Sequence, residues 1–217
     1  MPPRTSEAFI LRTYPYAEGD LVVSFLTRDQ GKLRGVAKRA RRTRSVFGSS
    51  LERLSQVRIS YSSRENAELV RIDSCELVQS QFGLISCYEA SVALDLIAEV
   101  TDQLLPASET NERFYRLIGA VLADLRGCEA AGLPKAVWRA VTYFAFWAVR
   151  LGGFLPELRV SAASRELARA IATTPVAALA AVDWDKETGQ DLRRFLFREI
   201  ERHLERRMTT FPILESL

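Results

Sequence analysis

The hydrophobic pattern of this chain changes its period near residue 80, and this change limits the folds that the sequence can adopt. Before that point, apolar and polar residues alternate in steps of two, as in residues 57–61, which is typical of strands with one buried face. After it, apolar residues recur in steps of three and four, as in residues 114–125, which is typical of amphipathic helices. We therefore predict an α+β chain with a β-domain over residues 1–80 and an all-helical domain over residues 81–217.

The β-rich part contains five short strand-like segments, which begin near residues 8, 21, 32, 57 and 69. Five strands fit a small closed barrel of the OB type better than a sandwich, which needs about seven. The segment Asp29-Gln30-Gly31 separates the second strand from the third and predicts a tight hairpin with Gly31 at a positive φ. A polar turn is expected at residues 62–66.

Composition excludes several classes of protein. Hydrophobic residues make up 47% of the chain and charged residues 26%, which is too apolar for a disordered chain. No apolar run of about 18 residues predicts a membrane span, and the first residues do not resemble a signal peptide. The three cysteines, at positions 75, 87 and 128, form no CxxC pair and fit a reducing compartment. We expect a cytoplasmic protein without a cofactor.

Positive charge is concentrated in the third strand and the run that follows it. Residues 28–44 hold eight cations and one anion, whereas the whole chain has a formal net charge of only +3. Such a patch attracts the phosphates of a polyanion, although a solvated loop is the alternative interpretation. Alternate residues of a strand share a face, and OB barrels bind oligonucleotides around strands two and three. The candidate DNA-binding residues are Arg28, Lys32, Arg34, Lys38, Arg39, Arg41, Arg42 and Arg44.

Several aromatic residues in this part are candidates for stacking on a base. Phe9 and Phe25 lie in apolar runs and are expected in the core, whereas Tyr16 and Phe47 lie in polar, loop-like surroundings. Tyr14 and Tyr61 are further aromatic residues of this part. The aromatic pattern alone does not decide which rings meet a ligand.

The helical part offers two further candidate surfaces. One predicted helix holds Trp138, Arg139, Phe146 and Arg150, which fit either a fully buried helix or a groove for an apolar partner peptide whose carboxylate an arginine would bind. The final helix carries an arginine every four residues. We interpret this stripe as a solvated face of ion pairs, with a secondary nucleic-acid contact as the alternative. Its members are Arg194, Arg198, Arg202 and Arg206.

No constellation of residues points to catalysis. His203 is the only histidine of the chain, so neither a His-based triad nor a zinc site is expected. The sequence has no P-loop, GxSxG motif or glycine-rich dinucleotide loop. We predict no catalytic residue, no metal ligand and no enzymatic activity.

Three N-terminal segments form a recognisable pattern: Glu18-Gly19-Asp20, Gly31-Lys32 and the basic block at residues 37–42. In these segments the sequence resembles the RecO family of bacterial DNA recombination and repair mediators, with Arg39 in place of the glycine usual in the family. The resemblance continues more weakly through residues 104–106, 111–114 and 151–156. Many members carry a four-cysteine zinc site after the last of these segments, but residues 159–164 here contain no cysteine, so no zinc is expected.

The resemblance implies an OB domain and a helical domain that bind single- and double-stranded DNA and anneal complementary strands. It also implies the loading of RecA onto strands coated with single-stranded-DNA-binding protein. The implied partners are RecR and the acidic, phenylalanine-ending tail of that coating protein. We expect a monomer when free, in a bacterial cytoplasm near the nucleoid. Three alternatives remain: an RNA-binding OB module with a helical adaptor, a nuclease with an atypical site, and a protein-only scaffold.

Overall fold

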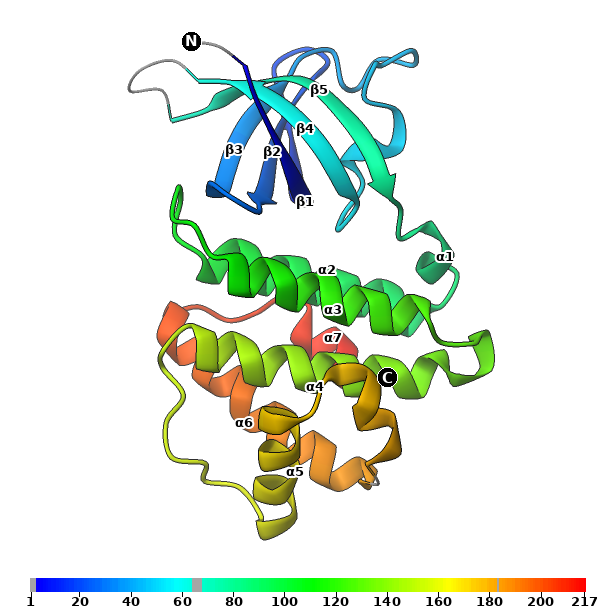
Figure 1. Cartoon of the computed structure of the whole chain (residues 1–217), viewed down its shortest axis with the longest axis vertical. Coiled ribbons are helices and arrows are strands. Elements are labelled where there is room, and N and C mark those ends of the chain that lie inside the picture. The colour runs from blue at the N-terminus through cyan, green and yellow to red at the C-terminus, as the bar shows by residue number, and fades with distance from the viewer. Residues whose placement is uncertain (1–2, 64–67, 183) are drawn as a thin grey trace. The chain divides into compact units, whose positions relative to one another are not determined.

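The computed structural model describes residues 3–63, 68–182 and 184–217, which form two compact units (Figure 1). The barrel unit comprises Met1–Gly83 and Ala98–Tyr115, and the helical unit comprises Leu84–Ile97 and Arg116–Leu217. Residues 98–115 thus group with the barrel although they follow it in sequence. The domain limits of 1–80 and 81–217 stay a prediction. Most of the polar turn expected at residues 62–66 lies outside the described residues.

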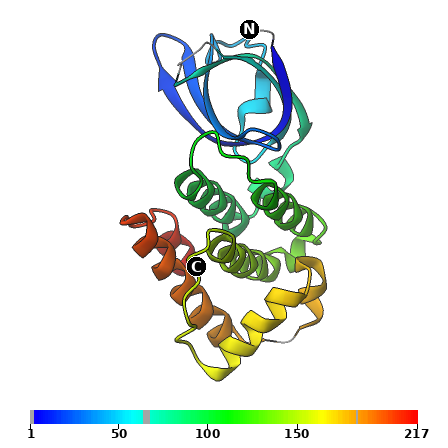
Figure 2. The ribbon, with the colours of Figure 1, turned by 60° about the vertical axis from the view of Figure 1, so that its left-hand side comes forward.

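The barrel unit contains the predicted five-stranded closed barrel, and Figure 2 shows its strands enclosing an interior. The strand order around the barrel is β1-β2-β3-β5-β4. The strands extend beyond the apolar runs that predicted them, because polar residues on the outer face continue the backbone pairing. Their bounds are β1 (Arg4–Tyr16), β2 (Asp20–Thr27), β3 (Gly31–Ala37), β4 (Gln56–Ser62) and β5 (Val70–Gln79).

The barrel closes through a short parallel pairing of β3 with β5, which joins Gly35–Ala37 to Val70–Ile72. A Cβ atom at Gly35 would lie 2.8 Å from side-chain atoms of both Val70 and Ile72, so the closure requires glycine there. Inward-facing side chains fill the interior, as burial of apolar surface demands. They are Ala8, Ile10, Val23, Phe25, Ala37, Phe47, Leu51, Val57, Ile59, Tyr61, Val70, Ile72 and Cys75.

The predicted hairpin between β2 and β3 is confirmed, with Gly31 at a φ of 73°. A second constraint acts on the same glycine, because a Cβ atom there would lie 2.0 Å from the Glu109 carbonyl oxygen. The backbone of residues 107–110 runs beside the hairpin, where the Ser108 amide donates to the Lys32 carbonyl over 2.8 Å. The barrel unit is therefore completed by a segment about 80 residues further along the chain.

The predicted helices are present, and together with the barrel they confirm the α+β fold class. The Asn111 side chain accepts a hydrogen bond from the Phe114 amide and so caps α3. Residues 176–181 form a 3₁₀ helix, and the short helices α1 and α7 had no periodic signal. The helices are α1 (Phe82–Ile85), α2 (Tyr88–Leu104), α3 (Glu112–Arg126), α4 (Leu133–Leu151), α5 (Ala162–Thr173), α6 (Lys186–Leu204) and α7 (Phe211–Glu215), with 3₁₀ helices η1 (Gly48–Leu51), η2 (Ala130–Gly132) and η3 (Val176–Ala181).

Among the described residues, none of the helices combines the length and the apolar character that crossing a membrane requires.

Candidate nucleic-acid interface

A row of side chains crosses the outer face of β1, β2 and β3. Val23 and Phe25 point into the barrel core, so Ser24 between them points outward. Ser24 pairs with Arg12 on one side and Arg34 on the other, and directly paired residues project to the same face. Two exposed arginines therefore flank Ser24 on the outer face of the barrel.

Tyr14 lies next to this row, two residues beyond Arg12 on β1. Its ring centroid is 5.2 Å from the Arg12 guanidinium carbon and 5.7 Å from that of Arg34. Both distances lie within the range of cation–π attraction. A register shift between Ile10 and Arg12 sets this arrangement, because a β-bulge changes which residues of β1 face outward.

The basic run after β3 forms a defined turn that is anchored to the turn between β1 and β2. The Arg39 amide donates to the Asp20 carboxylate over 2.7 Å, and the Arg41 amide donates to the Gly19 carbonyl over 3.0 Å. Arg39 has a φ of 58°, in the left-handed region that favours glycine. Gly19 and Asp20 thus fix the basic block, and the backbone at position 39 has a conformation that glycine adopts without strain.

The side chains of this turn are exposed and carry positive charge into solvent. In the described part of the chain, no carboxylate lies within ion-pair distance of any of its five cations. Because their charges are not neutralised internally, they are available to phosphates. We define the cationic face as Arg12, Tyr14, Tyr16, Arg34, Lys38, Arg39, Arg41, Arg42 and Arg44.

Lys32 has a different environment from the rest of the predicted set. Its ammonium is partly buried and donates to the Asp102 carbonyl in the last turn of α2. A cation at the C-terminal end of a helix binds the free carbonyls there and interacts favourably with the helix dipole. Burial lowers the pKa of Lys32, the charge of Asp102 counteracts this, and Arg34 lowers it further. The Asp102 carboxylate in turn accepts a 2.5 Å hydrogen bond from Ser24.

Arg28 also has partners within the barrel unit. Its guanidinium lies 3.5 Å from the Glu112 carboxylate and 4.0 Å from that of Glu7, although it is more than half exposed. The Thr110 hydroxyl donates to the Asp29 carbonyl beside it. Arg28 and Lys32 thus hold residues 98–112 against the hairpin, and their contacts with DNA stay a prediction.

The structure separates the aromatic candidates. Tyr16 is 48% exposed on the cationic face, whereas Phe9 and Phe25 are buried as expected. Phe47 is only 4% exposed and packs in the barrel core, so of the two aromatic residues with polar neighbours in sequence it is not open to a base. Helix η1 begins at the next residue, Gly48. Arg12 was missed because its role depends on the bulge in β1.

In the helical unit, the four residues of the candidate peptide groove differ in burial and in their partners. Arg139 holds Asp124 of α3 through a 3.0 Å ion pair, and both side chains are nearly buried. Phe146 is 3% exposed. Arg150 is exposed, with its guanidinium carbon 5.0 Å from the centre of the Trp147 ring. The groove stays a prediction, in which Arg150 is the one exposed cation of the four.

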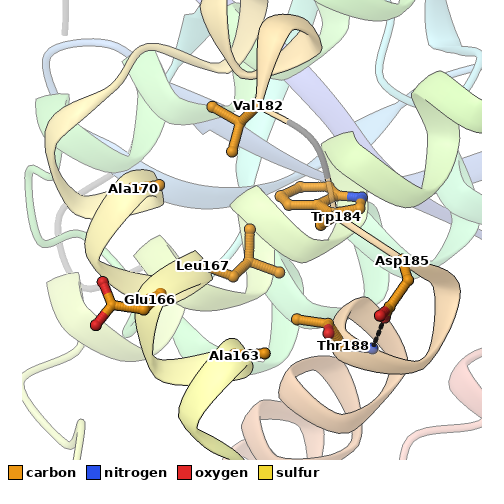
Figure 3. A pocket seen from close by; sticks show the side chains of 8 residues that line it. All are labelled: Ala163, Glu166, Leu167, Ala170, Val182, Trp184, Asp185 and Thr188. Atoms are coloured by element: carbon orange, nitrogen blue, oxygen red, sulfur yellow. Dashed lines mark hydrogen bonds between the residues drawn. The ribbon is translucent and has the colours of Figure 1, made fainter.

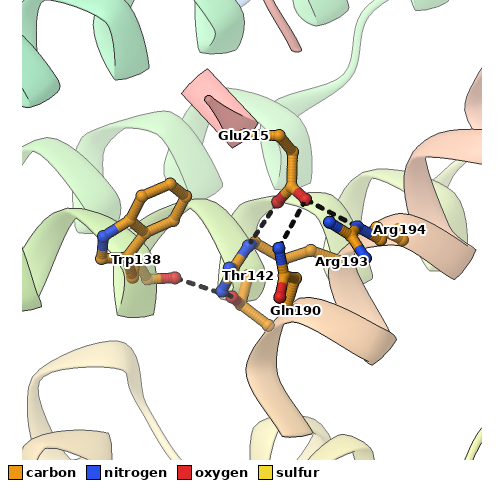
Figure 4. Close-up of polar contacts among 6 residues, drawn as sticks. All are labelled: Trp138, Thr142, Gln190, Arg193, Arg194 and Glu215. Atoms are coloured by element: carbon orange, nitrogen blue, oxygen red, sulfur yellow. Dashed lines mark hydrogen bonds and ion pairs between the residues drawn. The ribbon is translucent and has the colours of Figure 1, made fainter. Parts of the chain in front are cut away.

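Trp138 borders a buried charge cluster (Figure 4). Arg193 of α6 is only 4% exposed, and its guanidinium carbon lies 4.4 Å from the centre of the Trp138 ring. It donates to the Thr142 hydroxyl over 3.2 Å and to the Glu215 carboxylate of α7 over 3.4 Å. Arg194 reaches the same carboxylate over 2.8 Å. Burial lowers the pKa of Arg193, and Glu215 counteracts this.

The predicted arginine stripe is partly an ion-pair face, and its last member, Arg206, lies beyond the end of α6 at Leu204. Arg194 binds Glu215, and Arg202 binds Glu199 over 2.8 Å. His203 stacks on Phe154, with ring centroids 4.0 Å apart. A secondary contact of this stripe with nucleic acid stays the alternative interpretation.

A cavity of about 600 Å³ lies between α5, the end of η3 and the start of α6 (Figure 3). Leu167, Val182 and Trp184 supply its apolar wall, and Glu166 lies at its margin. Asp185 at its edge accepts a hydrogen bond from the Thr188 amide over 2.6 Å and so caps α6. The Asp185 carboxylate thus already has a structural role.

The residues present do not fit the zinc site of the four-cysteine members. Cys75 is buried in β5, and burial raises the pKa of its thiol. Cys87 and Cys128 lie elsewhere in the helical unit. Over the ranges that the structure describes, no three His, Cys, Asp or Glu side chains are grouped as metal ligands.

Comparisons with known proteins agree with this geometry. The family model described as "Recombination protein O N terminal" matches residues 1–81, and "Recombination protein O C terminal" matches residues 86–167. The DNA repair protein RecO of Koribacter versatilis is 38% identical over 99% of both chains. Those of Syntrophobacter fumaroxidans and Bifidobacterium adolescentis are 31% and 32% identical, over 70% and 74% of this chain and 58% and 63% of their own lengths.

The chain thus combines a closed OB-like barrel, which carries an exposed cationic face, with a following set of helices. The chain belongs to the RecO family, and its role is in DNA repair.

Proposed function

We propose that this chain is a recombination mediator without enzymatic activity, which binds single- and double-stranded DNA through its cationic face. It anneals complementary strands and helps to load RecA onto strands coated with single-stranded-DNA-binding protein. One observation carries the DNA-binding part: the five cations of the 38–44 turn are exposed and unpaired among the described residues, on a turn held in place by its own backbone.

Annealing follows from the same charge. Two DNA strands repel each other through their phosphates, and each cation that neutralises a phosphate releases a condensed counterion. A dense cationic face therefore lowers the cost of bringing two strands together. Because the contacts are with phosphates, affinity should depend strongly on salt and weakly on base sequence.

The partners are proposed from family membership. RecR and the acidic, phenylalanine-ending tail of single-stranded-DNA-binding protein are the two candidates, in a bacterial cytoplasm near the nucleoid. For the tail we place the carboxylate at Arg150, because Arg139 already binds Asp124 and Arg150 is exposed beside Trp147. Replacing Arg150 by alanine should weaken binding of a labelled tail peptide without changing DNA affinity.

The DNA-binding proposal is tested by a salt series with a labelled single-stranded oligonucleotide. Replacing Lys38, Arg39, Arg41 and Arg42 by alanine removes about four phosphate contacts. The log–log slope of affinity against salt concentration should then fall by roughly 3 on single strands. Fluorescence anisotropy at five salt concentrations measures the slope, and mixing complementary labelled strands measures annealing by energy transfer.

A matched control removes the same charge elsewhere, by changing Arg159, Arg165, Arg169 and Arg207 of the helical unit to alanine. Its slope should stay within about 0.5 of the unaltered protein, on the scale of about 0.7 per lost contact. An equal fall in both variants would show that net charge, rather than the cationic face, drives binding. Equal affinity for RNA of the same length would favour the RNA-binding alternative, and Mg²⁺-dependent cleavage would favour a nuclease.

A further inference from the structure

We infer that Tyr14 and Tyr16 make part of the cationic face selective for single strands. An unpaired base stacks on Tyr16, and Arg12 and Arg34, gathered around Tyr14, bind the flanking phosphates. This inference rests on the proposed DNA-binding function and adds to it a division of the face into two parts. The tyrosine part requires an unpaired base, whereas the 38–44 turn binds any phosphate backbone.

The geometry of β1 brings the aromatic and basic side chains together. Beyond its bulge, alternate residues share one face, so Arg12, Tyr14 and Tyr16 project to the same side of the barrel. Arg34 reaches this group from β3, through the row that contains Ser24. A basic surface interleaved with aromatic rings is the combination that single-strand-binding proteins use, because bases stack while cations follow the backbone.

The exposure of the two rings assigns them different roles. Tyr16 is 48% exposed, so a face of its ring is open to a base. Tyr14 is half-buried and has two guanidinium groups within 6 Å of its ring centre, so it positions the arginines.

The one exposed ring of this pair argues against a duplex ligand at this site, because stacking on Tyr16 requires the flat face of a base. Paired bases present their edges in the grooves, whereas their flat faces are covered by their neighbours. Lys38–Arg44 contains no aromatic residue, so the turn has no means to make this distinction.

The test compares Tyr16→Leu with Tyr88→Leu, which replaces a tyrosine of the helical unit that is 61% exposed. Each variant is titrated into a labelled oligothymidine and into a labelled duplex of equal phosphate number. Tyr16→Leu should weaken single-strand affinity by at least about fivefold and duplex affinity by less than about twofold, as expected for one lost base stack. Tyr88→Leu should change neither.

A second variant protects the test against misfolding. Tyr16→Trp keeps a stacking ring, so it should retain single-strand affinity, and its added fluorescence should be quenched by the oligothymidine but not by the duplex. Equal losses on both DNAs in Tyr16→Leu, or no loss on either, would overturn the inference and leave the proposed function intact. An unaltered protein that binds neither DNA at low salt would instead overturn the proposed function itself.

Discussion

The arginines of the 38–44 turn in the barrel unit and the arginines packed between helices in the helical unit have opposite environments. Arg39, Arg41 and Arg42 lie in a turn fixed by its backbone, and their side chains have no carboxylate nearby among the described residues. Arg139 and Arg193 are buried, and each is bound to a carboxylate from another helix. The same residue type is exposed and free of ion pairs in the described part of the turn, and structural in the helical core.

The difference shows that partners, rather than charge counts, decide what a cation does. A buried arginine without its carboxylate would leave an uncompensated charge in a medium of low polarity, so its environment must contain an anion. An exposed arginine loses little when it has none, because exposed ion pairs contribute about 0–1 kcal/mol. Each of the following predictions changes one group and tests whether its role is structural or depends on its exposure to solvent.

The largest effect is expected from Glu215→Gln. It removes the carboxylate of buried Arg193, and breaking a buried pair on one side costs about 3 kcal/mol or more in the free energy of unfolding. Urea denaturation measures the loss, and DNA affinity should not change. As a contrast, Glu112→Gln removes a partner of exposed Arg28 and should cost less than about 1 kcal/mol. Similar costs for both variants would contradict the division.

Tyr115 of the barrel unit has a strongly shifted pKa, which gives a smaller, pH-dependent effect. Burial, followed by the charge of Glu7, raises the pKa of Tyr115 from 10.0 to about 12. Between these values the unfolded chain loses its proton first, so stability is retained below pH 10 and falls as pH rises through this window. The fall is about 1.4 kcal/mol per pH unit, or up to about 3 kcal/mol in total. Chemical denaturation at pH 9, 10 and 11 measures it, and Tyr115→Phe should flatten the slope; an unaltered slope would assign the effect to other groups.

Lys32 and Arg34 form a matched pair, since they are two residues apart on one strand. Lys32→Met removes the cation that caps α2 and should cost about 1–2 kcal/mol of stability with little effect on DNA affinity. Arg34→Met should do the reverse, weakening single-strand binding several-fold while stability stays within about 0.5 kcal/mol. Denaturation and anisotropy on both variants make the comparison. A larger loss of DNA affinity in Lys32→Met would return Lys32 to the DNA-contacting set.

The smallest effect is expected at position 39, where the backbone has a positive φ. Arg39→Gly should raise the free energy of unfolding by about 0.5–1 kcal/mol, because glycine adopts this conformation without strain. Arg39→Ala retains a Cβ atom and should give no gain. Both should lower the salt slope on single strands by about 0.7, the value for one phosphate contact. A stabilised alanine variant would show that charge repulsion, rather than backbone strain, is relieved.

Local features of the fold could be predicted from the sequence. The change of hydrophobic period separated strands from helices, and the glycine at position 31 marked the hairpin, because both signals depend on neighbours in sequence. The cap of α3 is also a local feature, because the Asn111 side chain accepts a hydrogen bond from the Phe114 amide three residues later. Phe47 has polar neighbours in sequence, yet its surroundings in the fold are the barrel core.

The candidate site was predicted less completely. Lys32 was expected on the outer face, but Asp102 lies 70 residues away and no local pattern connects the two. Arg12 depends on a bulge, which shifts the alternation by one residue without a composition signal. The exposed turn was found because charge density is visible in sequence. The buried ion pairs of the helical unit were not predicted, because they depend on which helices pack together.

The discontinuous barrel unit has a consequence for the order of events during synthesis. Gly31 lies against the backbone of residue 109, and the Lys32 ammonium needs the end of α2, so the barrel has no complete outer face until residues 98–115 have emerged. A chain stopped near residue 80 would carry all five strands, but Phe9 would lack Tyr115, whose ring centroid lies 4.7 Å from its own. The nascent barrel is therefore incomplete until residues 98–115 have been synthesised. During this period we expect it to be most prone to aggregation.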